Sequence, residues 1–135
     1  MRYELELIHQ LSSELELPCN VADERAEVTL GQGVVLCFQN SERQEDCLIG
    51  FKGTPWHTHD DITFEDGLGN SIELNCLDLV SSLKDGSVFV CERWKDGEAK
   101  DRWLIHRDCN DLKNELKYMS EYEELRVFRA RRTEA

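Results

Sequence analysis

The stretch AEVTLGQGVVLCF, residues 26–38, indicates the fold class of this chain. It holds two apolar runs, AEVTL and VVLCF, on either side of a Gly-Gln-Gly tripeptide. Strand-forming runs joined by a short link that contains glycine are typical of a β-hairpin. The run CLIGF, residues 47–51, follows the polar segment NSERQED. We therefore expect three consecutive strands in an antiparallel meander.

Helical patterns lie on both sides of this meander. In residues 3–17, leucine and isoleucine recur at helical spacing while glutamates largely occupy the other faces, and Pro18 marks the end. A second helix is predicted over residues 76–84. Asn75 is its expected N-cap, and Gly86 is expected to stop it.

The second half of the chain predicts further strands and a last helix. ITF and SIEL are strand-like runs around the turn GLGN, and SVFVCERW and DRWLIH predict a hairpin around KDGEAK. Trp94 and Trp103 lie on the two strands of that hairpin and could form a cross-strand aromatic pair, although a core or half-buried position on the sheet face is the favoured interpretation. Asp108 is expected to cap a short helix that reaches about Met119. A final strand is expected over residues 124–130.

This order of elements predicts one α+β domain over residues 1–135, because strands dominate and helices stand at the start, middle and end. The expected architecture is a largely antiparallel sheet with an N-terminal helix, a middle helix and a short C-terminal helix. No apolar run approaches the roughly 20 residues of a membrane-spanning helix. The N-terminus, MRYELELIHQ, lacks the apolar segment of a signal peptide, so we expect a cytoplasmic protein.

The chain has 6 cysteines, and none of them forms a CxxC pair. Several stand inside apolar runs such as VVLCF and VFVCERW, which predicts buried free thiols rather than a zinc site or a disulfide framework. Cys109 follows His106-Arg107-Asp108, close to a predicted helix start that would lower the pKa of its thiol. A structural role for Cys109 is still the favoured interpretation.

The negative charge is concentrated in the first half of the chain. The net charge is −12. Residues 1–75 hold 4 basic and 15 acidic side chains, a net charge of −11, whereas residues 76–135 hold 12 basic and 13 acidic ones, a net charge of −1. Such a field repels nucleic acid and anionic lipid, and it attracts basic proteins. Solubility alone is the competing explanation.

The segment TPWHTHDD, residues 54–61, is the most chemically rich part of the sequence. In an extended segment His57 and His59 point the same way and could share one metal ion. Asp60 and Asp61 could add an oxygen ligand, and His106 is a third nitrogen candidate. The competing interpretation is a structural loop in which the preceding Pro-Trp pair provides an anchor and the histidines face solvent.

Known catalytic patterns are absent from the sequence. The segment from His57 to Asp61 matches the first five positions of the HxHxDH pattern of metallo-β-lactamase-like enzymes, but Ile62 stands at the sixth, so we reject that family. No nucleophile elbow and no Gly-rich phosphate loop occurs. We therefore predict no catalytic residue and no cofactor.

Two longer stretches resemble a family of binding proteins. TPWHTHDDITF and LDLVSSLKDGSVFVCERWKDGEAKDRWLI resemble the small acidic α+β immunity proteins of bacterial polymorphic-toxin systems and cover about half of the chain. The resemblance implies a class of protein and no particular residues. Such proteins typically occupy a toxin's active site and mimic or block its anionic substrate.

Our functional hypothesis is an immunity-type inhibitor of a basic toxin, in the bacterial cytoplasm. A secretion-type chaperone, usually a homodimer, and a small metal-dependent enzyme built on His57 and His59 are the alternatives. No binding to nucleic acid or membrane is expected, and the sequence leaves the oligomeric state open. The predicted partner-binding residues are Trp56, Asp60, Asp61, Glu65 and Asp66.

Overall fold

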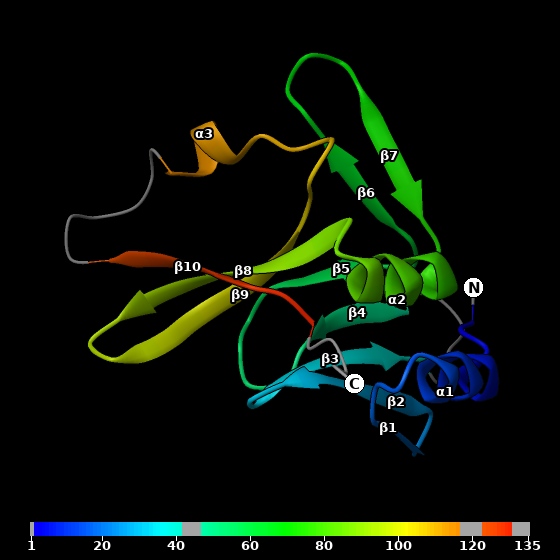
Figure 1. Ribbon diagram of the computed structural model, residues 1–135. Helices are drawn as coiled ribbons and strands as arrows, with labels where there is room; N and C mark the ends of the chain where they lie inside the picture. Colours follow the sequence, from blue (N-terminus) through cyan, green and yellow to red (C-terminus); the bar gives the residue numbers. More distant parts are fainter. Residues whose placement is uncertain (1, 42–46, 117–122, 131–135) are drawn as a thin grey trace.

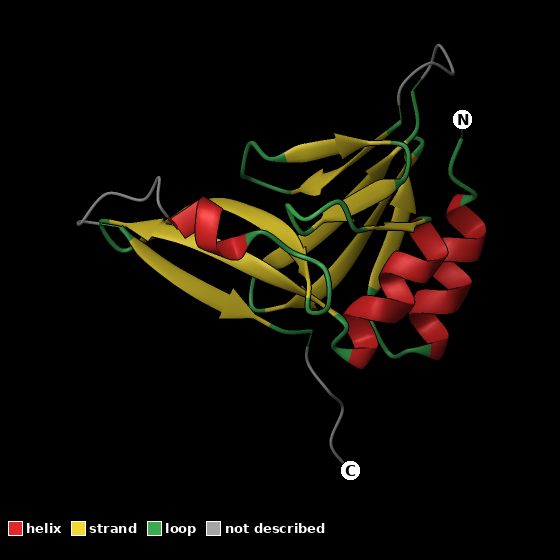
Figure 2. Cartoon of the chain, turned by 90° about the horizontal axis from the view of Figure 1, so that it is seen from above, coloured by secondary structure: helices red, strands yellow, loops and turns green. Residues whose placement is uncertain are grey.

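The computed structural model describes residues 2–41, 47–116 and 123–130. Within these residues the chain forms three antiparallel sheets and three helices (Figure 1). The first two helices lie side by side at one end of the molecule, as Figure 1 and Figure 2 both show. The predicted α+β class, with a largely antiparallel arrangement, an N-terminal helix, a middle helix and a short C-terminal helix, is confirmed.

The largest sheet is a five-stranded meander in which consecutive strands pair with each other. Its strands are β1 (Cys19–Ala22), β2 (Arg25–Gly31), β3 (Val34–Gln39), β4 (Leu48–Phe51) and β5 (His57–His59). The β2–β3 hairpin and the following β4 are the three strands predicted from the sequence. The two edge strands, β1 and β5, were not predicted.

The other two sheets hold the second half of the chain. Their strands are β6 (Ile62–Glu65), β7 (Ser71–Leu74), β8 (Val88–Lys95), β9 (Glu98–His106) and β10 (Glu124–Phe128). Among the described strands β6 pairs only with β7, and the last sheet has the order β10-β8-β9. The β6–β7 hairpin projects from the body of the molecule (Figure 1).

Trp94 and Trp103 are both half-buried, which confirms the favoured interpretation, but they do not form a cross-strand pair. Trp103 lies opposite Cys91, and Trp94 lies opposite Ala99. The strands run further toward their turn than the sequence indicated, and the register shifts between Arg93 and Trp94. The two indoles therefore belong to different surroundings.

Capping residues set the bounds of the middle helix. The three helices are α1 (Leu5–Glu14), α2 (Cys76–Asp85) and α3 (Leu112–Leu116). The Asn75 side chain accepts a hydrogen bond from the backbone N–H of Asp78 at 2.8 Å. Gly86 follows α2 with φ 87° in the left-handed region, where glycine carries no Cβ penalty. Both predicted caps of α2 are confirmed.

The other two helices differ from the prediction at their ends. α1 ends before the predicted residue 17, because Glu16 turns the chain with φ 60°. The side chain of Asn110, rather than that of Asp108, accepts the first backbone N–H of α3 at 3.3 Å. Asp108 instead forms an ion pair with the preceding arginine. The predicted continuation of α3 to Met119 lies outside the described residues.

One hydrophobic core joins all three sheets to α1 and α2. Alternation along β2 shows how the sequence produces it, because Ala26, Val28 and Leu30 are buried while the residues between them are half-exposed. The largest fully buried side chains include Ile8, Leu30, Leu36, Phe38, Ile49, Leu79, Leu83, Val88 and Val90. Among the described residues, every helix is too short or too polar to span a membrane.

The β2–β3 turn packs against the last described strand. A methyl group added at Gly31 would lie 2.8 Å from Cζ of Phe128, which is closer than real contacts allow, and Gly31 has φ 148°. We therefore expect Gly31→Ala to lower the free energy of unfolding by about 2–3 kcal/mol, measured by urea denaturation, because the Phe128 ring must move to admit the methyl group. Gly33→Ala in the same turn meets no atom within 4 Å. This control should lose only roughly 1 kcal/mol of unfolding free energy, the cost of placing alanine in the left-handed region. Equal losses of stability in the two variants would contradict the packing argument.

The segment before α1 is attached to the sheet by Asn40. Its Oδ1 accepts a hydrogen bond from the Tyr3 N–H at 2.7 Å, and its Nδ2 donates to the Tyr3 carbonyl at 3.0 Å. Asn40 is 3% exposed and Tyr3 is 5% exposed. The Tyr3 hydroxyl donates to the carbonyl of Asp60 at 2.6 Å, and its ring meets Phe38 edge-on. This contact ties the N-terminus to the TPWHTHDD segment.

All six cysteines are free thiols. Four are buried and two, Cys19 and Cys76, are half-buried, which agrees with the prediction of small hydrophobic side chains. The predicted fall in the pKa of Cys109 is wrong, because burial and the nearby Asp66 carboxylate raise it. Its thiol donates to the Phe64 carbonyl at 3.3 Å, on the inner side of the β6–β7 hairpin.

Candidate partner-binding site

The two histidines of TPWHTHDD stand on the edge strand β5. His57 and His59 are both exposed, Thr58 between them is half-buried, and the two rings lie 5.3 Å apart between centroids. The expectation that both histidines point the same way is confirmed. Trp56, just before β5, is half-buried and packs on Phe51 with ring centroids 5.9 Å apart.

The predicted third nitrogen ligand lies in a different setting. His106 is 7% exposed, and its ring packs on Phe64 at 5.5 Å. Its Nδ1 accepts a hydrogen bond from the backbone N–H of Asp108 at 3.1 Å. In the described part of the chain, no three His, Cys, Asp or Glu side chains are grouped so that they could hold a metal. A metal on His57 and His59 would need its other ligands from elsewhere, and this interpretation stays a prediction.

Two of the four predicted acidic residues have structural partners. Asp60 has φ 59°, its Oδ1 accepts from the Cys47 N–H at 3.3 Å, and its carbonyl accepts from Tyr3. The Asp66 carboxylate accepts from the N–H of Leu68 at 2.8 Å, and from the backbone and side-chain amides of Asn70. These hydrogen bonds lower the pKa of Asp66. Asp60 and Asp66 therefore hold loops in place.

The four residues also fail to form one compact cluster. Asp60 and Asp61 precede β6, whereas Glu65 ends it and Asp66 follows. Asp61 and Glu65 are four positions apart along an extended chain, which corresponds to about 13 Å. The acidic residues are thus spread along the β6–β7 hairpin.

Alternation in this hairpin nevertheless creates an acidic surface. Ile62 and Phe64 are buried, so Thr63 and Glu65 point outward, and Glu73 lies opposite Thr63. We call the carboxylates of Glu65 and Glu73 on this outward side, together with that of the half-buried Asp61 just before β6, the acidic hairpin face. Among the described residues, no Lys or Arg forms an ion pair with any of the three. Glu73 was missed, although the period-two alternation of SIEL could have indicated it.

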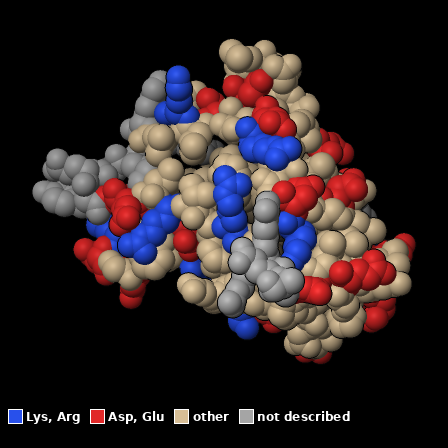
Figure 3. Space-filling view, viewed as in Figure 1, with Lys and Arg blue, Asp and Glu red and all other residues tan. Residues whose placement is uncertain are grey.

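The surface charge follows the division seen in the sequence. Figure 3 shows acidic side chains dominating the side of the molecule that carries α1, α2 and β7. Lys and Arg gather instead toward β8, β10 and α3 in the same view. The acidic hairpin face therefore belongs to the more negative side of the protein.

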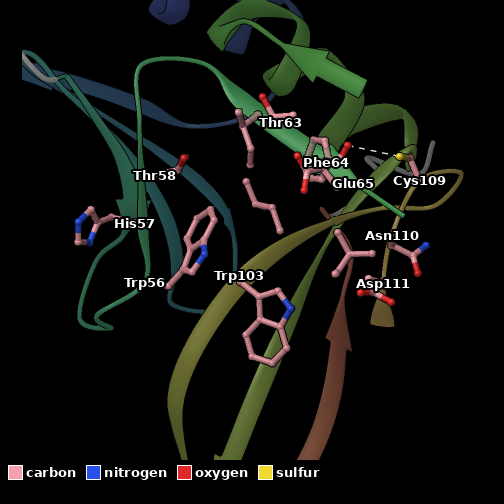
Figure 4. Close-up of a pocket in the computed structure, with 13 residues that line it drawn as sticks. Trp56, His57, Thr58, Thr63, Phe64, Glu65, Trp103, Cys109, Asn110 and Asp111 are labelled. Atoms are coloured by element: carbon pink, nitrogen blue, oxygen red, sulfur yellow. Dashed lines mark hydrogen bonds between the residues drawn. The ribbon is translucent and has the colours of Figure 1, made fainter. Parts of the chain in front are cut away.

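A pocket of about 260 Å³ lies where the three sheets meet. β5, β6 and β9 each form the edge of their sheet, and all three line this pocket. Figure 4 shows the indoles of Trp56 and Trp103 on one side, with Glu65, Asn110 and Asp111 on the other. The backbone N–H of Trp56 donates to the Asp101 side chain at 3.0 Å, which ties the Trp56 loop to β9.

The structure thus gathers some of the predicted site residues and separates others. Trp56, His57 and Glu65 line one pocket, whereas Asp60 and Asp66 are engaged in loop contacts. Trp103 and Asp111 also line the pocket and were not predicted to do so, because the sequence did not show that β9 and the segment after it approach β5. Comparison with family models, curated proteins and solved structures found no match to this chain.

Proposed function

We propose that this protein is a non-catalytic binding module, an immunity-type inhibitor that neutralises a basic toxin in the bacterial cytoplasm. The acidic hairpin face is the observation that carries the proposal. Its three carboxylates have no described cationic partner, so their charge is available to another protein. Two of them, Glu65 and Glu73, are exposed.

The hairpin offers these charges in a fixed geometry, which supports the proposal. Asp66 locks the turn through three hydrogen bonds, and the buried side chains of Ile62 and Phe64 fix the strand to the core. A surface that is already ordered loses little conformational entropy when it binds. Complementary charge raises the rate of encounter with a basic partner and excludes acidic ones.

Affinity capture tests this proposal. Wild-type protein and the triple variant Asp61→Lys, Glu65→Lys and Glu73→Lys are incubated at low salt with lysate and secretome of the source organism. We expect the wild type to capture a basic protein and the variant to capture at least about tenfold less of it. The substitutions turn electrostatic attraction into repulsion, both during the encounter and in the bound complex.

A matched control carries the same change of charge on α1 and its N-cap residue. Glu4, Glu6 and Glu14 are exposed, and no described Lys or Arg forms an ion pair with them. The control with all three replaced by Lys should retain most of the captured partner. Equal capture by wild type and hairpin variant would exclude the acidic hairpin face from the interface.

A further inference from the structure

We propose that the pocket between β5, β6 and β9 receives an arginine side chain of the partner. This inference rests on the proposed function, because it names the group that the acidic side of the protein recognises. The pocket contains aromatic and acidic groups from separate parts of the chain. They are Trp56 before β5, Glu65 on β6, Trp103 on β9, and Asp111 before α3.

The charge of the lining favours a cation. Glu65 and Asp111 are its two carboxylates, and none of the residues that line the pocket is Lys or Arg. Asp111 already accepts a hydrogen bond from the Asn114 side chain at 2.8 Å, which holds its carboxylate in position. Glu65 is exposed and has no ion pair with a described Lys or Arg. A cation entering the pocket would therefore meet carboxylates that form no ion pair with a described Lys or Arg.

The aromatic side of the pocket selects among cations. The indoles of Trp56 and Trp103 form one side of the lining, opposite the carboxylates (Figure 4). A guanidinium group is planar, is more weakly hydrated than an ammonium group, and stacks on indole faces while it donates to carboxylates. An ammonium group is strongly hydrated, and it has no planar face that could stack on an indole. The combination of indoles with carboxylates therefore fits arginine better than lysine.

The volume of the pocket is consistent with binding one side chain, and the strand edges around it could bind the backbone of the same segment. A volume of about 260 Å³ is below the roughly 300–1,000 Å³ of pockets for drug-sized ligands. The edges of β5, β6 and β9 also leave backbone groups that are not paired within their sheets. An extended segment carrying the arginine could hydrogen-bond to such an edge, as in β-strand addition.

Indole NMR signals provide a test that needs no identified partner. Three tryptophans give three indole N–H signals in the folded protein, and only Trp56 and Trp103 line the pocket. The probe is the peptide acetyl-Gly-Arg-Gly-amide, compared with its citrulline and lysine counterparts. We expect saturable shifts of the Trp56 and Trp103 signals with the arginine peptide, weaker binding of the lysine peptide, and none with the uncharged citrulline peptide.

A matched pair of variants on one hairpin separates the pocket from the general acidic field. Glu65→Gln is expected to weaken binding of the arginine peptide about fivefold, whereas Glu73→Gln, outside the pocket, should leave it within about twofold. The assignment would be overturned if the two variants weakened binding equally, or if the arginine peptide caused no saturable shift. It would also be overturned if the citrulline peptide caused equal shifts or the lysine peptide bound more tightly. The peptide experiment does not use the partner protein. If it showed no arginine binding in the pocket, the affinity-capture test of the acidic hairpin face would still be valid.

Discussion

Replacing Asn40 with Ala is expected to lower the free energy of unfolding by about 3 kcal/mol. The substitution removes the acceptor of the Tyr3 N–H and the donor to the Tyr3 carbonyl, at 2.7 and 3.0 Å. Both backbone groups belong to a residue that is 5% exposed. Each buried group left without a partner costs about 1–3 kcal/mol. Urea denaturation followed by circular dichroism measures the loss.

An exposed asparagine provides the control for this experiment. Asn20 lies on the edge strand β1 and is exposed. Asn20→Ala should change the free energy of unfolding by no more than about 0.5 kcal/mol. If both variants lost the same stability, the attachment of the N-terminus through Asn40 would be contradicted.

Raising the pH above about 9 is expected to destabilise the protein progressively. Burial raises the pKa of the thiols of Cys19, Cys37 and Cys76, and it raises that of the Tyr3 phenol. In the unfolded chain the pKa values are the ordinary ones, about 8.5 for a thiol and about 10 for tyrosine. As the pH rises, the unfolded chain therefore begins to lose these protons while the folded state still keeps them. The unfolded state then binds fewer protons, so stability falls as pH rises.

The size of this effect grows with pH. Between its unfolded and folded pKa, each group removes up to about 1.4 kcal/mol per pH unit. The thiols act from about pH 8.5 and the phenol joins from about pH 10. Urea midpoints at pH 7, 9 and 10.5 under reducing conditions measure the fall. Tyr3→Phe should remove the phenol contribution above pH 10, and a midpoint that stayed constant to pH 10.5 would refute the prediction.

Local signals in the sequence were sufficient for much of the fold. The Gly-Gln-Gly tripeptide between two apolar runs identified the β2–β3 hairpin, because turn chemistry and alternation agree there. Asn75 and Gly86 identified α2, because a cap depends on its immediate neighbours. Where the deciding interactions were longer in range, the prediction failed. A Trp94–Trp103 pair depended on the strand register, and the register places Trp103 opposite Cys91, three positions before Trp94.

The candidate site shows the same limit. Asp60 and Asp66 were predicted from charge alone, but turn geometry uses both of their carboxylates inside the chain. Trp103 and Glu65 are 38 positions apart in the sequence and meet only because the edges of two sheets approach each other. Composition could therefore predict an acidic surface, whereas the pocket required the fold.

The association rate with the captured basic protein tests the central proposal most directly. The rate constant is measured at several salt concentrations for the wild type and for the variant Asp61→Lys, Glu65→Lys, Glu73→Lys. We predict that the wild type associates at least about tenfold faster at low salt, and that the variant loses most of this salt dependence. Identical rates and identical salt dependence for the two proteins would contradict the proposal that the acidic hairpin face recognises the partner.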